Sequence, residues 1–179
     1  MNRALALPLL VLGLVVVMLP AVVQAADAFR ITKITTRLDE GTYRLGFDID
    51  FDFSEQALEA LENGVPLTIM VHIQLRAVDA WIWNDSVVDA RLRYAIRYKP
   101  LSERYEVYRL PGNRGRSFVS REAAIAALGE FRDLDLVSAS ALDPGSDYEV
   151  HIKTELDIEE LPLPLRPIAY LRPAWDLES

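Results

Sequence analysis

The sequence predicts a mainly β domain of the α+β class, an antiparallel β-sandwich-like structure or a strongly curved sheet with two short helices. Apolar and polar residues alternate with a period of two in five segments, as in strands with one buried and one solvated face. The links between most of these segments are too short for the crossover helices of a parallel sheet. The chain of 179 residues has no cysteine, so its stability depends on a packed core.

The N-terminal segment predicts export. Arg3 precedes an unbroken apolar stretch from Ala4 to Val23, and Val23-Gln24-Ala25 places small residues where a signal peptidase cleaves. Residues 1–25 are therefore predicted to be a signal peptide, and residues 26–179 a single β-rich domain in the periplasm or otherwise outside the cytoplasm. An uncleaved single-pass anchor is the alternative, because about 20 apolar residues can span a bilayer. Cleavage is favoured by Pro8, Pro20 and Asp27.

The first two strands are predicted to form a hairpin followed by a helix. Residues 29–38 are rich in Ile and Thr, and residues 39–42 have turn composition. Residues 43–53 then show the clearest alternation of apolar and polar side chains in the chain. Ser54 caps a short helix, which ends near Asn63 because a glycine and a proline follow.

Further along the chain, alternation predicts more strands at residues 67–76, 88–98 and 148–158, and residues 104–110 pair back on the second of these. Residues 111–116 are expected to form a loop, and Ser120 caps a second helix through Leu128. Residues 131–142 are ambiguous, with a short extended piece as one interpretation, and residues 143–146 form a turn. In total the pattern predicts about six strands, mostly antiparallel.

Three carboxylates, Asp48, Asp50 and Asp52, share one strand face. They suggest either a calcium or paired-carboxylate site, or a solvated acidic face. Calcium loops of this type need glycine at the sixth position, where this chain has Phe53, so the solvated face is favoured. The arginines of the strand at residues 88–98 are expected to neutralise it.

Two groups of residues are candidates for a ligand or partner surface. Arg91, Arg93 and Arg97 share a strand face and suit an anionic ligand, although cross-strand ion pairing is the favoured interpretation. Trp81 and Trp83 would form a flat apolar platform if exposed, and would close the end of the core if buried, which is favoured.

The sequence predicts no catalytic residue, no metal site and no cofactor. His72 and His151 are the only imidazoles, and no serine lies on a nucleophile elbow. Both histidines are expected at the surface, although they could bind a metal with a carboxylate if their strands were adjacent. The net charge of −8 argues against a nucleic-acid groove.

Near the C-terminus, residues 160–167 (Glu-Leu-Pro-Leu-Pro-Leu-Arg-Pro) predict an extended polyproline-type strap. A docked strap is favoured over a peptide offered to a partner. This signature, with Trp175 beyond it and Gly64-Val65-Pro66-Leu67 earlier, resembles a family of uncharacterised exported proteobacterial proteins, a domain-of-unknown-function family. The resemblance spans nearly all of the chain after residue 25. It implies export and no established activity.

The sequence therefore predicts a non-enzymatic exported binding or accessory module whose partner is an unknown protein of the cell envelope. No nucleic acid is expected, and membrane contact is expected only if the signal sequence stays uncleaved. The alternatives are an envelope hydrolase that uses a carboxylate with His72 or His151, or a membrane-anchored subunit of an envelope complex.

Overall fold

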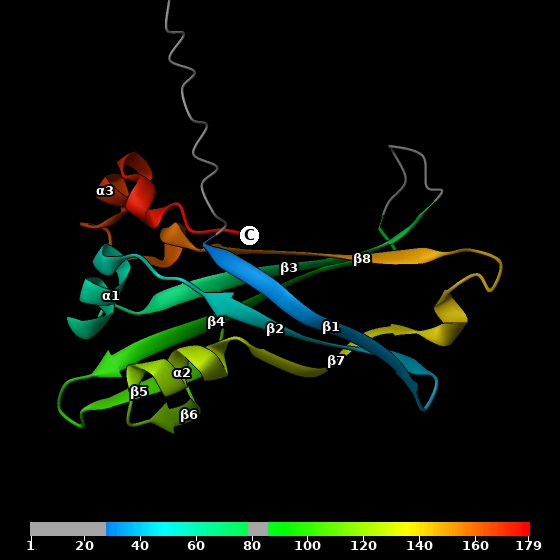
Figure 1. Cartoon of the computed structure of the whole chain (residues 1–179), viewed down its shortest axis with the longest axis horizontal. Coiled ribbons are helices and arrows are strands. Elements are labelled where there is room, and N and C mark those ends of the chain that lie inside the picture. The colour runs from blue at the N-terminus through cyan, green and yellow to red at the C-terminus, as the bar shows by residue number, and fades with distance from the viewer. Residues whose placement is uncertain (1–27, 79–85) are drawn as a thin grey trace, which may run out of the picture.

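A computed structural model describes residues 28–78 and 86–179 (Figure 1). Two antiparallel sheets form the body of the described chain, with strand orders β1-β2-β7 and β6-β5-β4-β3-β8. Their apolar faces share one core, and short helices cover it at one end of the strands. The mainly β, sandwich-like fold predicted from the sequence is confirmed.

The bounds of the elements follow the predicted pattern closely, but the described residues contain more strands than expected. The strands are β1 (Phe29–Asp39), β2 (Thr42–Phe51), β3 (Leu67–Ala77), β4 (Val88–Lys99), β5 (Arg104–Arg109), β6 (Gly115–Phe118), β7 (Glu130–Ser138) and β8 (Tyr148–Leu156). The α-helices are α1 (Glu55–Glu62), α2 (Arg121–Leu128) and α3 (Arg166–Leu171), and the 3-10 helices are η1 (Ala139–Ala141), η2 (Ile158–Glu160) and η3 (Pro173–Trp175).

The alternation in β2 correctly predicts which face is buried. Leu45, Phe47 and Ile49 are buried in the core, and the ring of Phe47 stacks on Phe131 of β7 with the centroids 4.5 Å apart. The turn between β1 and β2 is tight, because Glu40 and Gly41 both have positive φ angles, of 48° and 78°. That geometry matches the twist of an antiparallel hairpin.

Two strands were not predicted, and each has a local reason. β7 pairs with β2, but register shifts interrupt the pairing and Asp133 has a φ of 53°, so its apolar residues lose the period of two. β6 lies in the expected loop and pairs with β5. It begins at Gly115, where only glycine fits, because a Cβ atom there would lie 1.9 Å from the carbonyl oxygen of Val107.

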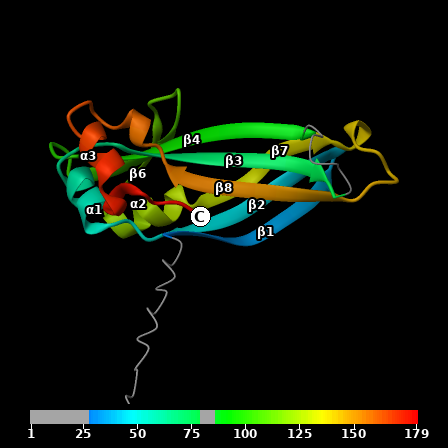
Figure 2. The same cartoon turned by 90° about the horizontal axis from the view of Figure 1, so that it is seen from above.

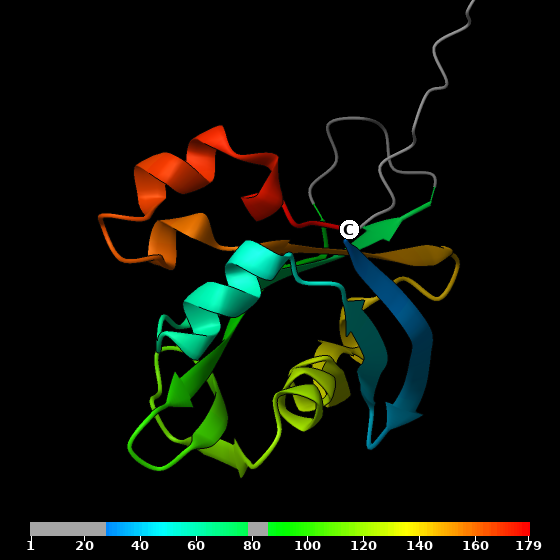
Figure 3. The same ribbon diagram turned by 60° about the vertical axis from the view of Figure 1, so that its left-hand side comes forward.

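Both predicted helix caps are present. The Ser54 Oγ accepts a hydrogen bond from the Ala57 amide at 3.3 Å, and the Ser120 Oγ accepts one from the Ala123 amide at 3.2 Å. The helix that follows Ser120, α2, contacts strands of both sheets, β2 on one side and β4, β5 and β6 on the other. Figure 3 shows α2 filling the space between the sheets at that end.

The proline-rich segment differs from the expected extended strap. Residues 162–165 form a turn, in which the Leu165 amide donates to the Pro162 carbonyl at 2.8 Å, and α3 begins directly after it. Pro167 lies in the first turn of α3, where a missing amide proton costs no helical hydrogen bond. Leu161 is 1% exposed and Leu163 is 74% exposed, so the segment's leucines do not form one continuous buried ridge.

The C-terminal residues connect the two sheets. The Leu156 amide of β8 donates to the Leu177 carbonyl at 2.9 Å, and the Ser179 amide donates to the Thr154 carbonyl at 3.0 Å. From the other sheet, the Phe29 amide donates to the Glu178 carbonyl at 3.2 Å. Figure 2 shows the C-terminus between the end of β8 and the start of β1. This tail closes one side of the sandwich.

Asp48 joins the three strands of the first sheet. Its Oδ2 lies 2.8 Å from the Lys33 Nζ of β1, and its Oδ1 forms an ion pair with Arg132 of β7. The expectation that arginines of β4 neutralise the acidic face is wrong, because β4 belongs to the other sheet. Hydrogen bonds from Lys33 and then Arg132 hold the pKa of Asp48 below its usual range.

The buried part of the proline-rich segment can be tested with a matched pair of leucines. Leu161→Ala should lower the free energy of unfolding by about 2–5 kcal/mol, because it leaves a cavity in the core. Leu163→Ala, two residues away on the exposed side of the turn, should change it by less than about 0.5 kcal/mol. Urea unfolding followed by circular dichroism measures both. Equal effects would contradict the described packing.

The Asp48 contacts predict a pH dependence of stability. A carboxyl with a depressed folded-state pKa stabilises the fold above its unfolded pKa of about 4, and this contribution is lost as the pH falls through the folded pKa. Asp48→Asn should therefore lower the melting temperature at pH 7, and the difference from the wild type should shrink below about pH 4. Asp50→Asn, at an exposed position of the same strand, is the control. A pH-independent difference for Asp48→Asn would contradict this role.

Candidate functional site

The first half of β4 is paired on one side only within the described residues. β4 pairs with β3 from Val88 to Ile96, but with β5 only from Tyr94 to Lys99. The Leu110 amide donates to the Arg93 carbonyl at 2.9 Å, so the backbone groups of Arg93 point away from β3. Because backbone groups alternate along an antiparallel strand, those of Asp89 and Arg91 point the same way. They form an open strand edge.

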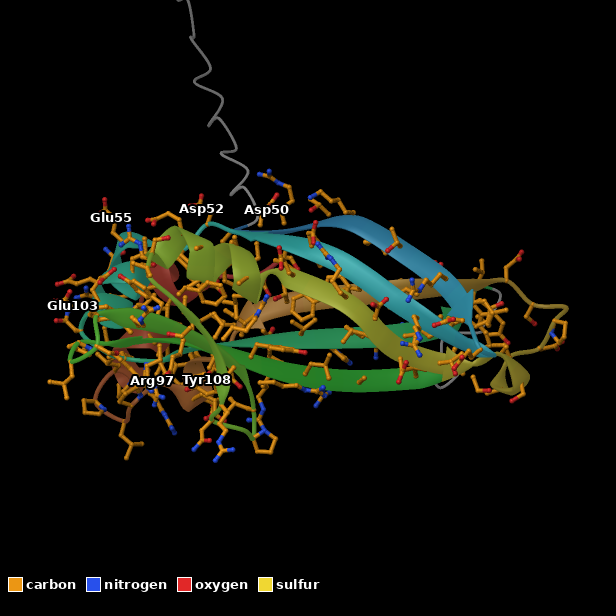
Figure 4. All side chains as sticks on the ribbon, turned by 90° about the horizontal axis from the view of Figure 1, so that it is seen from below. Asp50, Asp52, Glu55, Arg97, Glu103 and Tyr108 are labelled. Atoms are coloured by element: carbon orange, nitrogen blue, oxygen red, sulfur yellow. The ribbon has the colours of Figure 1, made fainter. Side chains whose placement is uncertain are left out.

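A groove lies between this half of β4 and β7, the edge strand of the other sheet. It encloses a cavity of about 370 Å³ with Val88, Ala90 and Leu92 on the β4 side and Leu134 and Leu136 on the β7 side. In Figure 4, which shows the molecule from below, the two strands run beside each other. We call this feature the β4–β7 groove.

The floor of the β4–β7 groove belongs to the core. Leu45 of β2 and Ile73 of β3 line its base, and both are buried. The groove therefore reaches from the open edge to the packed interface of the two sheets. Apolar side chains that enter it would add directly to the core.

Charged side chains of opposite sign stand on the two sides of the groove. Arg109 of β5 lines one end, with its guanidinium 6.0 Å from the centre of the Tyr94 ring, and it has no ion pair within the described chain. On the β7 side, Asp133 pairs with Arg37 at 2.9 Å, and Asp135 lies 3.7 Å from Arg44. The available charge at the groove is therefore the cation.

The three arginines predicted as a candidate surface differ in their ion pairs. Arg93 pairs with Glu160 at 2.6 Å, and Arg97 pairs with Glu106 at 3.1 Å. Arg97 also stacks over the Tyr108 ring at 5.4 Å. Arg91, the residue between Asp89 and Arg93 on the open edge, has no ion pair with any residue that the structure describes.

The outer face of β4, which bears the arginines, and the acidic face of β2 lie on different sides of the molecule. Figure 4 shows Arg97 and Tyr108 on one side, and Asp50 and Asp52 on the other. The candidate residues Trp81 and Trp83 lie outside the described residues.

Both histidines lie on the outer face of the second sheet, on the adjacent strands β3 and β8. The His72 Nε2 lies 2.9 Å from the Asp89 Oδ1, and the His151 Nε2 lies 2.7 Å from the Glu149 Oε1. Both carboxylates are about half exposed, at 47% and 51%. Hydrogen bonds from Gln74 and then His72 lower the pKa of the Asp89 carboxyl.

Across residues 28–78 and 86–179, no three His, Cys, Asp or Glu residues are grouped so that they could hold a metal ion. A larger cavity, of about 480 Å³, lies between the end of β8, α3 and the C-terminal tail. Its lining includes Leu156 and Leu177, which the backbone bond between β8 and the tail joins, and the buried Trp175. Its walls include both apolar and charged side chains, and we assign it no ligand.

Sequence reasoning named Arg91 as a candidate, which stays a prediction, but it missed the β4–β7 groove. One signal for it was present: the alternating segment of β4 spans 12 residues, whereas its hairpin partner β5 spans only 6. The unequal lengths leave half of β4 without a partner on that side. The opposite wall was hidden, because the bulges in β7 obscure its strand pattern.

Within the described residues, no helix is long and apolar enough to cross a membrane. No curated protein and no solved structure matches this chain. One family model does match, over residues 26–179, and it confirms the expected membership of a domain-of-unknown-function family. The chain belongs to the family described as Domain of unknown function (DUF4390).

Proposed function

We propose that this protein is exported and acts as a non-enzymatic binding module, which contacts another protein of the cell envelope through the β4–β7 groove. The observation that carries the proposal is the groove itself, because it combines an apolar interior with an unpaired strand edge. Monomeric proteins usually protect such edges, so an open one marks a surface for another chain.

The surroundings of the histidines favour binding over hydrolysis. A catalytic acid or base generally lies in a recess, where burial and neighbouring charges shift its pKa. Here Asp89 and Glu149, the carboxylates that contact His72 and His151, are about half exposed on a sheet face. These two pairs therefore resemble surface ion pairs and lack the surroundings of a hydrolytic centre.

Export is supported by the sequence of residues 1–25, with its basic start, apolar middle and small-residue end. A cysteine-free core also suits an oxidising compartment, because no free thiol is available for wrong disulfides. The proposed partner is therefore a protein of the same compartment.

The absence of cysteine allows a site-specific test. Asp135→Cys places a single thiol at the rim of the groove, and Asp52→Cys places one at an exposed position just beyond β2, outside the residues that line the groove, with the same change of charge. Each variant is labelled with a photoactivatable cross-linker and irradiated in native envelopes. We expect one adduct of defined mass from Asp135→Cys and none from Asp52→Cys. If the protein is exported and cleaved, its N-terminus should lie near Ala26.

An adduct of the same mass from both variants, or none from Asp135→Cys, would contradict contact through the groove. A product in the cytosol that still begins at Met1 would contradict export. Excess unlabelled protein should compete with the adduct at the groove, which excludes random encounters as its source.

A further inference from the structure

We propose that the groove binds an extended segment of its partner, which adds to the open edge of β4 as a further strand. This inference rests on the proposed function and specifies the form of the bound chain. The segment would pair with β4 along Val88–Arg93 and direct alternate side chains into the β4–β7 groove.

The backbone of β4 provides the hydrogen-bonding groups for such a strand. The amide and carbonyl groups of Asp89 and Arg91, together with the amide of Arg93, face the open side and have no backbone partner within the described chain. They recur every two residues along regular strand backbone, which is the spacing that an extended chain can match. A helix would use its own backbone bonds internally and leave this edge unpaired.

The other long edges of the sheets are bulged or partly covered, although residues 148–153 of β8 have no strand partner on their outer side within the described residues. A register shift interrupts β1 beside Lys33, whose φ is 51°, and β7 has a similar irregularity at Asp133. Such bulges disturb the pairing of an added strand. The edge of β8 is covered over Thr154–Leu156 by the C-terminal tail. Along Val88–Arg93, by contrast, β4 keeps an unshifted register with β3.

Side chains on the two faces of β4 specify the composition of the bound segment. Positions that point inward meet Leu134 and Leu136, and therefore suit aliphatic side chains. Positions that point outward lie beside Asp89, which His72 and Gln74 already contact, and beside Arg91, which has no ion pair with a described residue. An acidic residue there would pair with it across the strands. We therefore expect alternating aliphatic and acidic residues over about six positions.

A second copy of this chain fits the edge less well. Paired antiparallel about Ala90, two β4 edges would place each Arg91 opposite Asp89, whose carboxylate already contacts His72 and Gln74. Paired about Arg91, they would place the two Arg91 side chains directly opposite each other. Like charges at opposed positions destabilise a sheet. A different protein segment, with acidic residues at those positions, avoids this repulsion.

The test uses a designed peptide of alternating valine and glutamate, eight residues long and blocked at both ends. Amide hydrogen exchange of the purified protein is measured by NMR with and without the peptide. We expect exchange at Arg91 and Asp89 to slow by about tenfold or more at saturation, because their amides gain carbonyl partners. The amides of Ala90 and Leu92, which face β3, should change little.

Three matched controls separate strand addition from simple charge attraction. A peptide of the same composition, with all valines before all glutamates, should not protect these amides. N-methylation of alternate amides on one edge of the peptide should weaken binding about tenfold. Arg91→Glu should weaken binding of the valine–glutamate peptide about two- to fivefold. The same variant should bind a peptide with lysine in place of glutamate about as tightly as the wild type binds the original peptide.

Each alternative occupant gives a distinct result that overturns the inference. Protection of Arg91 that rises with protein concentration alone would indicate a second copy. Peptide binding without protection of the Arg91 and Asp89 amides would exclude strand addition. Equal protection by the control peptide with all valines before all glutamates would exclude it too. If the groove cross-link forms but the alternating peptide does not bind, the inference fails while the proposed function stands. A missing cross-link removes the proposed function itself.

Discussion

The structure depends on the packing of two apolar sheet faces that no disulfide links. The chain has no disulfide, and within the described residues no strand belongs to both sheets. Burial of residues such as Phe47, Leu67 and Ile69 therefore provides the main stabilising free energy. The backbone bonds of the C-terminal tail to β8 and β1 supplement it along one side of the sandwich. The opposite side, between β4 and β7, has no such connection and contains the groove.

The elements that the sequence predicted well are those in which one local pattern determines the structure. The alternation in β2 gave the correct buried face, and Ser54 and Ser120 begin the helices that they were expected to cap. Where a long-range contact decides the conformation, prediction failed. β7 is a strand because it pairs with β2, although Asp133 disturbs its pattern. Pro167 lies in the first turn of a helix instead of extending a polyproline segment, and Leu161 before it is buried in the core.

The candidate site was predictable only in part, for the same reason. Alternation placed Arg91, Arg93 and Arg97 on one polar face, as the structure has them, but a sequence pattern does not state which sheet a strand joins. Asp48 was expected to pair with arginines of β4, but it pairs with Lys33 and Arg132 of its own sheet. Likewise, the β4–β7 groove arises from two strands that are about 40 residues apart in the sequence and belong to different sheets. No local pattern contains that information.

An unpaired strand edge beside an apolar groove carries a risk of aggregation, and the other long edges of the described chain are bulged or partly covered. The persistence of the open edge on β4 is the central claim of the account. Residue-resolved amide exchange of the free protein tests it most directly. The account predicts an alternation along β4, with slow exchange at Ala90 and Leu92 and fast exchange at Asp89 and Arg91. Uniformly slow exchange at all four amides in dilute solution would show that the edge is already covered.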